Sequence, residues 1–117
     1  MKRGDVVLID FPFTTGSGSK KRPALVVQCD RNNARLQDTI VAIVTSNITR
    51  ASHEPTQYTI DPSHPDWKAS GFRLPSVVKC EHLYTFHQQR VLRTIGQLSA
   101  ATMLEINECL KSSLELH

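Results

Sequence analysis

Apolar residues occur in short runs along most of the chain, and polar segments rich in Gly, Ser, Asn and Pro separate these runs. Runs of β-branched and apolar residues bounded by such turn residues are typical of β-strands. The pattern predicts strands over residues 5–11, 23–28, 39–46, 58–60 and 76–86, and leaves 91–98 ambiguous between a strand and a turn. Five or six short strands at close intervals favour a small antiparallel barrel or a strongly curved sheet.

The end of the chain has a helical period instead. Apolar residues recur at 103, 106, 110 and 114, which is the spacing of one helix face. Ser99 is a candidate N-cap, so we expect a helix over 99–116 that covers one side of the strands. The Asn-rich segment 30–38 and the segment 61–71 are expected to be turns or loops. The predicted class is therefore mainly β with a C-terminal helix.

Length and composition limit the class of protein. A chain of 117 residues with 39% apolar content suits one compact domain, so we expect a single domain over 1–117. The formal charge of +3 and the pI near 8.9 permit a nucleic acid or an acidic protein as partner without requiring either. The three cysteines have no CxxC spacing, so they suggest neither a disulfide framework nor a zinc site.

Cellular location follows from the same features. The odd number of cysteines fits a reducing compartment. The N-terminal sequence MKRGDVVLIDF contains only a short apolar run, and no segment approaches the ~18 apolar residues that cross a bilayer. We therefore expect a cytoplasmic protein with no membrane partner.

The strand predicted at 76–86 places charged residues close together. A period of two puts Val77, Lys79, Glu81 and Leu83 on one face, and Val78, Cys80, His82 and Tyr84 on the other. Lys79 and Glu81 could act together on one ligand. They could equally form an ordinary ion pair at the sheet surface, and the spacing alone leaves both interpretations open.

Three further segments carry candidate ligand-binding groups. In KKRPALVV (20–27) the proline biases the residue before it towards extended geometry, so Arg22 is expected to begin a strand. The sequence TSN (45–47) ends the most apolar strand with two hydroxyls and an amide, which suit phosphate oxygens or base edges. The segment TTGSGSK (14–20) is expected to be a loop that can move over a site. Each also has a structural alternative: a solvated cation, turn residues and a hairpin connection.

In this order and spacing, these segments resemble the MazF/PemK/Kid family of toxins from bacterial toxin–antitoxin modules. The resemblance covers nearly the whole chain through KRGDVVLIDF, KRPALVVQ, IVAIVTSNI, SVVKCEHLYTF, IGQLS and MLEINECLKSSLEL. It implies a small SH3-like barrel of five to seven short strands with a C-terminal helix (CcdB/MazF-like), which agrees with the predicted strands and helix. Members of this family are sequence-specific endoribonucleases that cut messenger RNA.

The resemblance also implies a reaction that needs no metal or cofactor. The RNA's own 2′-OH would attack the phosphate and leave a 2′,3′-cyclic phosphate and a 5′-hydroxyl. By their positions in the family's motifs, Arg22 would hold the scissile phosphate, Thr45 would hydrogen-bond it, and Glu81 would be the base. Lys79 stands where Kid-like members have an arginine, and it would add positive charge. No general acid is assigned, because an arginine is a poor acid and alternation puts His82 on the other face from Glu81.

Substrate binding is expected from residues next to these. Lys20 and Lys21 would follow the RNA backbone as point charges, and Ser46 and Asn47 would bind the substrate. Base selection is expected from loops 14–20 and 47–57, with Phe13, Asn47 or Tyr84 stacking on bases or reading their edges. Many family members carry an acidic segment just before the RP motif. This chain has none there, which leaves Glu81 as the candidate base.

Partners follow from the resemblance as well. It implies a homodimer that binds single-stranded RNA, and a cognate antitoxin whose flexible acidic segment lies over the RNA groove. Two other functions on the same fold stay open: a CcdB-like gyrase-binding toxin and a non-catalytic binding module. Gyrase binding in that family uses C-terminal residues that include a tryptophan, whereas the only tryptophan here is Trp67 in a predicted loop. The RP, TS and KCE sequences together favour the nuclease.

Overall fold

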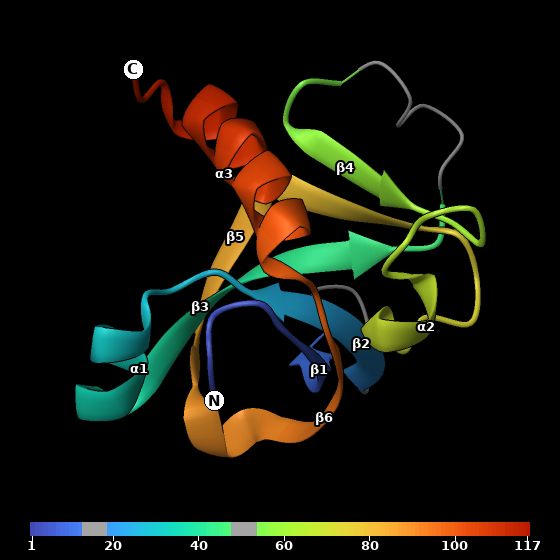
Figure 1. The fold of residues 1–117 in the computed structure, drawn as a ribbon. Helices are drawn as coiled ribbons and strands as arrows, with labels where there is room; N and C mark the ends of the chain where they lie inside the picture. Colours follow the sequence, from blue (N-terminus) through green and yellow to red (C-terminus); the bar gives the residue numbers. More distant parts are fainter. Residues whose placement is uncertain (13–18, 48–53) are drawn as a thin grey trace.

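The strands and helices follow the predicted order with few changes. The computed structural model describes residues 1–12, 19–47 and 54–117. Its elements are β1 (Asp5–Pro12), β2 (Ser19–Val26), α1 (Asp30–Arg35), β3 (Asp38–Thr45), β4 (Gln57–Ile60), α2 (Trp67–Ser70), β5 (Ser76–His87), the 3₁₀ turn η2 (Gln88–Arg90), β6 (Val91–Gln97) and α3 (Ala100–Leu114) (Figure 1). The ambiguous segment 91–98 is thus a strand.

All six strands belong to one antiparallel sheet in the order β4-β5-β3-β2-β1-β6. The sheet is strongly curved, and α3 packs against β5 and β4 (Figure 1). Ser99 caps α3 as predicted, because its side chain accepts a hydrogen bond from the Thr102 N–H. The mainly β class with a C-terminal helix is therefore confirmed.

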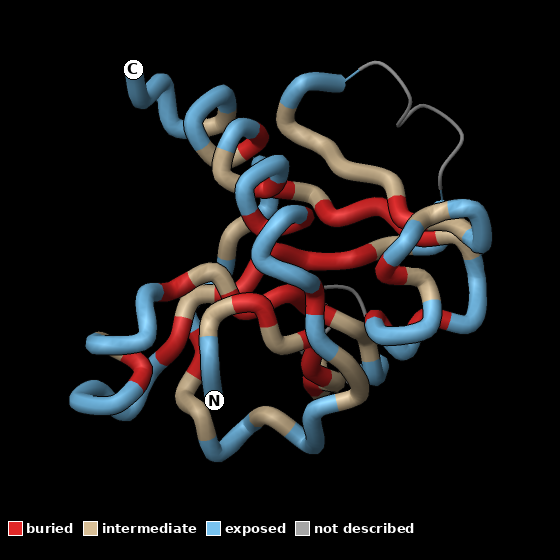
Figure 2. Tube along the Cα trace, in the orientation of Figure 1, coloured by how far each residue is buried: buried red, intermediate tan, exposed pale blue. Residues whose placement is uncertain are grey.

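Buried apolar side chains form two cores on opposite faces of the sheet. Figure 2 shows that the buried residues are concentrated along the central strands. The helix-side core contains Val6, Leu25, Ala42, Val44, Ile60, Phe72, Val78, Cys80, Leu98, Met103, Ile106 and Cys109. The opposite core contains Val7, Ile9, Ala24, Val26, Val41, Ile43 and Phe86. Because both faces of the central strands are buried, these strands read as continuous apolar runs without alternation.

The expectation that 30–38 and 61–71 have no regular structure was wrong, because each contains a short helix. The amide of Asn33 explains α1. It donates to the Gln28 backbone oxygen at 3.0 Å and accepts from the Gln28 side chain at 2.9 Å and from the Thr39 hydroxyl at 2.7 Å. These partners lie outside α1 and stabilise it, so the helix cannot be predicted from the local sequence preferences of residues 30–35.

The predicted alternation along β5 was also wrong beyond residue 80. Ala42 of β3 pairs with Leu83, but the next residue, Ile43, pairs with Lys79, so residues 80–82 form a bulge. Leu83 therefore packs on the helix-side core, while Tyr84 pairs with Val41 of the opposite core. The expected faces of these two side chains are exchanged.

Candidate functional site

A cavity of about 1010 Å³ opens at one end of the sheet. Its walls come from the start of β2, the end of β3, the segment between α2 and β5, and β6. Six of the residues predicted from sequence line it together: Lys20, Lys21, Arg22, Thr45, Ser46 and Asn47. We call this cavity the basic groove.

Strand pairing brings the start of β2 and the end of β3 to the same side of the groove. β2 begins earlier than predicted because its basic residues continue the ladder with β1 as far as the pair Pro12↔Ser19. The pairing of β2 with β3 ends at Ala24↔Ile43, and Arg22 and Thr45 lie two residues beyond it on each strand. A step of two residues keeps both on the face that carries the opposite core. Arg22 and Thr45, 23 residues apart in sequence, thus line the same groove.

The hydroxyl of Thr45 is arranged to donate. Its oxygen accepts a hydrogen bond from the backbone N–H of Asn47 at 3.2 Å. An oxygen that accepts from a backbone donor keeps its own proton for another acceptor. A phosphate oxygen held by Arg22 would be such an acceptor, so the pair combines a permanent positive charge with a hydrogen-bond donor.

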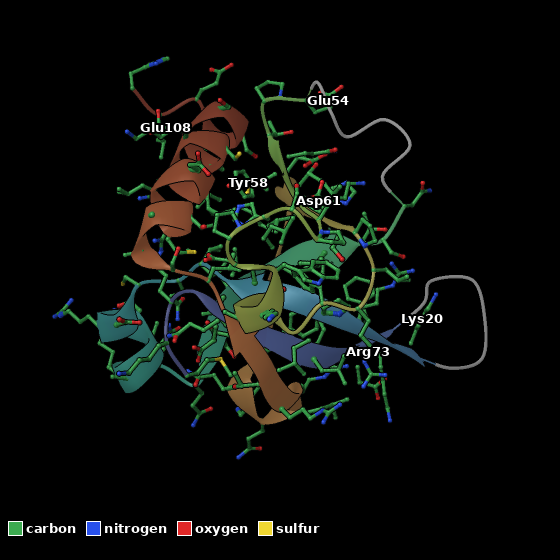
Figure 3. All side chains as sticks on the ribbon, turned by 45° about the vertical axis from the view of Figure 1, so that its right-hand side comes forward. Lys20, Glu54, Tyr58, Asp61, Arg73 and Glu108 are labelled. Atoms are coloured by element: carbon green, nitrogen blue, oxygen red, sulfur yellow. The ribbon has the colours of Figure 1, made fainter. Side chains whose placement is uncertain are left out.

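The groove is strongly positive. Five cations line it in the described part of the chain: Lys20, Lys21, Arg22, Arg73 and Arg93. No aspartate or glutamate is among the described residues that line it. Figure 3 shows Lys20 and Arg73 on the same side of the molecule, away from Glu54 and Glu108. Concentrated charge of one sign in a cavity attracts anions, although the whole chain carries only +3.

Sequence reasoning missed Arg73 and Arg93. Each is a single cation among apolar neighbours, in GFRLP and VLRTI, and neither sequence has a motif. Only the pairing of β6 with β1 reveals the position of Arg93, because Leu8 pairs with Arg93 on one side and with Pro23 on the other. These three paired residues lie side by side on β6, β1 and β2, and so connect the two walls of the groove.

Two glycines fix the wall that carries these arginines. A Cβ on Gly71 would lie 2.2 Å from the backbone oxygen of Ile95, and Gly71 has φ +78. A Cβ on Gly96 would lie 2.3 Å from the backbone oxygens of Ala69 and Ser70. The end of α2 and the glycine that follows it therefore pack on β6 backbone to backbone, which only glycine permits.

Lys79 and Glu81 lie outside the groove. Lys79 pairs with Ile43 on one side and with Gln57 on the other, so it shares the face of Arg22 and Thr45. Glu81 is exposed and accepts a hydrogen bond from the side chain of Gln57. Thr45 pairs with Val77, and Glu81 follows Val77 by four residues, at most about 13 Å along the strand. The roles assigned to Lys79 and Glu81 stay predictions.

The residues expected to read bases are only partly described. Phe13 and most of the loops 14–20 and 47–57 lie outside the described residues. Asn47 lines the groove, whereas Tyr84 does not. The Tyr84 ring contacts Phe11 edge-on, with 4.9 Å between the ring centroids.

A polar network ties β4 and the segment after it to α3 and its N-cap. The Tyr58 hydroxyl donates to Glu105 and lies 2.8 Å from His64 Nε2, and His64 Nδ1 accepts from the Asp66 N–H at 3.0 Å. Asp66 in turn accepts from the Ser99 N–H at 2.8 Å. Burial would raise the pKa of Asp66, but hydrogen bonds from Ser99 and Thr102 outweigh it and lower that pKa.

Two other kinds of site were sought in the described part of the chain. Residues 1–12, 19–47 and 54–117 contain no group of three or more His, Cys, Asp or Glu side chains placed to hold a metal ion. None of the helices described is long and apolar enough to cross a membrane.

Comparisons with known proteins find relatives that match nearly the whole chain. A family model described as "PemK-like, MazF-like toxin of type II toxin-antitoxin system" matches residues 2–114. Endoribonuclease EndoA of Bacillus subtilis is 36% identical, covering 99% of this chain and 96% of EndoA. Endoribonuclease MazF9 of Mycobacterium tuberculosis is 32% identical, with 99% and 98% covered. A solved mycobacterial endoribonuclease in complex with its cognate antitoxin superimposes with a TM-score of 0.75 at 25% identity, covering 100% of this chain and 97% of that one.

Proposed function

Because the chain belongs to the PemK-like, MazF-like family of type II toxin–antitoxin toxins, we propose that it is an endoribonuclease that cuts single-stranded RNA in the basic groove. The observation that carries this proposal is the meeting of Arg22 and Thr45 in a cavity lined by cations. A guanidinium fork beside a hydroxyl donor matches the oxygens of a phosphodiester. The relatives named as endoribonucleases along their full length support the same reaction class.

The proposed reaction uses the nucleophile that RNA itself provides. The 2′-oxygen forms a bond to phosphorus, the bond to the 5′-oxygen breaks, and the products are a 2′,3′-cyclic phosphate and a 5′-hydroxyl. Arg22 offsets the negative charge that grows on the phosphorane, and Thr45 donates to one of its oxygens. Glu81 takes the proton of the 2′-OH and Lys79 adds charge, while the 5′-oxygen takes a proton from a group that we do not assign.

This proposal is tested by cleavage in EDTA. Purified wild type, Arg22→Ala and Thr45→Val are incubated with a long single-stranded RNA, and the fragment ends are mapped by sequencing. Arg31→Ala, which changes an exposed cation of α1 outside the groove, is the matched control. We expect discrete cuts with cyclic-phosphate ends from wild type and control, and losses of roughly 10²–10³-fold in both groove variants. A folded wild type that leaves RNA intact would overturn the proposal in favour of a binding module.

We also propose that the chain acts as a homodimer under the control of a cognate antitoxin. The solved relative that binds its cognate antitoxin supports this control. A flexible acidic segment would suit the five cations of the basic groove as well as RNA does. Antitoxin and RNA should then exclude one another, and a stable ternary complex with intact RNA would contradict shared use of the groove.

A further inference from the structure

We propose that Arg73 and Arg93 form a second phosphate subsite, which holds a phosphate of the bound RNA next to the scissile one and so sets the length of RNA that is gripped. This inference rests on the proposed function and deepens it. The two arginines come from the segment before β5 and from β6, on the wall of the groove opposite β2 and β3.

The first support is the separation of the two walls. Arg93, Leu8 and Pro23 lie side by side on three successive strands. Two strand spacings place Arg93 about 10 Å from Pro23, the residue that follows Arg22. Arg22 pairs with Ile9 and shares its face, whereas Arg93 pairs with Leu8 and shares the other face. The two side chains therefore leave the sheet on different faces, which suits two different phosphates.

The second support is that neither guanidinium is used by the fold. Arg73 and Arg93 are exposed, and their guanidinium groups make no hydrogen bond or ion pair within the described part of the protein. Structural arginines in the same chain look different. Arg3 donates to the Val27 backbone oxygen at 2.9 Å and to the Asn107 side chain at 2.5 Å, and Arg35 donates to Asn32 at 3.0 Å.

The third support is that the wall is rigid although the arginines are exposed. The backbone contacts of Gly71 with Ile95, and of Gly96 with Ala69 and Ser70, leave no room for a side chain between the two segments. Two forks on a fixed backbone lose less freedom on binding than cations on a mobile loop. Beside them Leu74 is 60% exposed, which offers an apolar contact to a nucleobase next to its phosphate.

The test measures how binding depends on salt. The probe is a 2′-O-methyl RNA oligonucleotide, which cannot be cut, and its affinity is measured by fluorescence anisotropy from low to high salt. Arg73→Gln, Arg93→Gln and the double variant are compared with wild type and with Arg31→Gln. Loss of one phosphate contact should reduce the slope of log K against log salt by about 0.7–1 in the double variant. Arg31→Gln should keep the wild-type slope.

A second readout separates this role from a general loss of structure. The double variant should cut a minimal substrate that spans only the scissile phosphate with the wild-type kcat, and should show a raised KM only on longer RNA. An unchanged salt slope, or an equal loss on short and long substrates, would overturn the subsite. The subsite would also be overturned if the variants lost affinity for an acidic peptide but kept their affinity for RNA, because the arginines would then bind a protein partner.

Failure of the inference differs from failure of the proposed function. If wild type cuts RNA and the variants bind like wild type, only the second subsite is rejected. If the variants change the salt slope while wild type cuts no RNA, the subsite stands and the nuclease activity is rejected.

Discussion

Single side chains in the basic groove supply charge and a hydroxyl, whereas the candidate base lies outside it. Arg22 and Thr45 line the groove, and Glu81 is hydrogen-bonded to Gln57 further along β5. A base has to reach the 2′-OH beside the phosphate that we propose Arg22 holds. The geometry of Glu81 therefore makes its role a question for kinetics.

Glu81→Gln decides that role. If Glu81 is the base, kcat on RNA should fall by roughly 10²–10⁴-fold with KM little changed. Gln57→Ala removes only the partner of Glu81 and is the matched control, expected to lose much less. A Glu81→Gln variant that changes KM alone would assign the carboxylate to RNA binding instead.

The cysteines offer a residue-level test of the packing. Cys80 is 0% exposed and burial raises its pKa to about 12, while burial also raises the pKa of Cys109. Because the thiolate is the reactive form, only the exposed Cys29 should react quickly with an aromatic disulfide reagent in the native protein. Cys29→Ser should abolish the fast phase, and all thiols should react in guanidinium. Fast reaction of two or more thiols without denaturant would contradict the buried core.

At the scale of elements, the contact of α2 and Gly71 with β6 positions the wall of the groove that carries Arg73 and Arg93. Gly96→Ala places a methyl group against the backbone of Ala69 and Ser70, so the free energy of unfolding should fall by about 1–3 kcal/mol and RNA affinity should fall with it. Ala101→Gly, on the exposed first turn of α3, should cost at most about 1 kcal/mol without any change in RNA affinity. Urea unfolding measures the stability of both variants, and fluorescence anisotropy measures their RNA affinity. Unaltered RNA binding by Gly96→Ala would show that this wall does not contribute to RNA binding.

The hydrogen bond from the Ser99 N–H to Asp66, which anchors the start of α3, predicts that the free energy of unfolding depends on pH. The pKa of Asp66 is lower in the folded chain than in the unfolded one, so its contribution is present above the unfolded value near 4 and is lost as pH falls through the folded pKa. Asp66→Asn should lower the free energy of unfolding by about 1–3 kcal/mol at pH 7 and flatten its decline below pH ~4. Urea titrations at pH 7, 5 and 3 measure this, with the exposed Asp38→Asn as control. Equal acid sensitivity in wild type and Asp66→Asn would refute the anchor.

These elements also show what the sequence could and could not predict. Apolar runs and the Ser99 cap were enough for the strands and α3, because local pattern and burial agree there. Residues 30–35 form a helix because Asn33 makes side-chain contacts outside it. The bulge at 80–82 is set by the pairing of β5 with β3. Arg73 and Arg93 join the groove only because β6 returns beside β1. Such long-range pairings leave no local signal in a single sequence.

For the whole molecule, the distribution of charge matters more than the total. A net charge of +3 is modest, yet five cations meet in one groove, where no carboxylate is found among the described lining residues. The central claim is that this groove lets RNA attack its own backbone. That claim concerns the substrate's 2′-hydroxyl as much as any residue of the protein.

The most direct measurement therefore changes the substrate. Once the cut site is mapped, wild type is incubated in EDTA with that RNA and with the same RNA carrying a single 2′-deoxy sugar on the 5′ side of the cut. We predict that both bind alike, that the RNA is cut to a 2′,3′-cyclic phosphate, and that the single 2′-deoxy substitution abolishes the cut. Cleavage of both substrates at the same position and rate would contradict the mechanism, because a nucleophile other than the 2′-OH would then be acting.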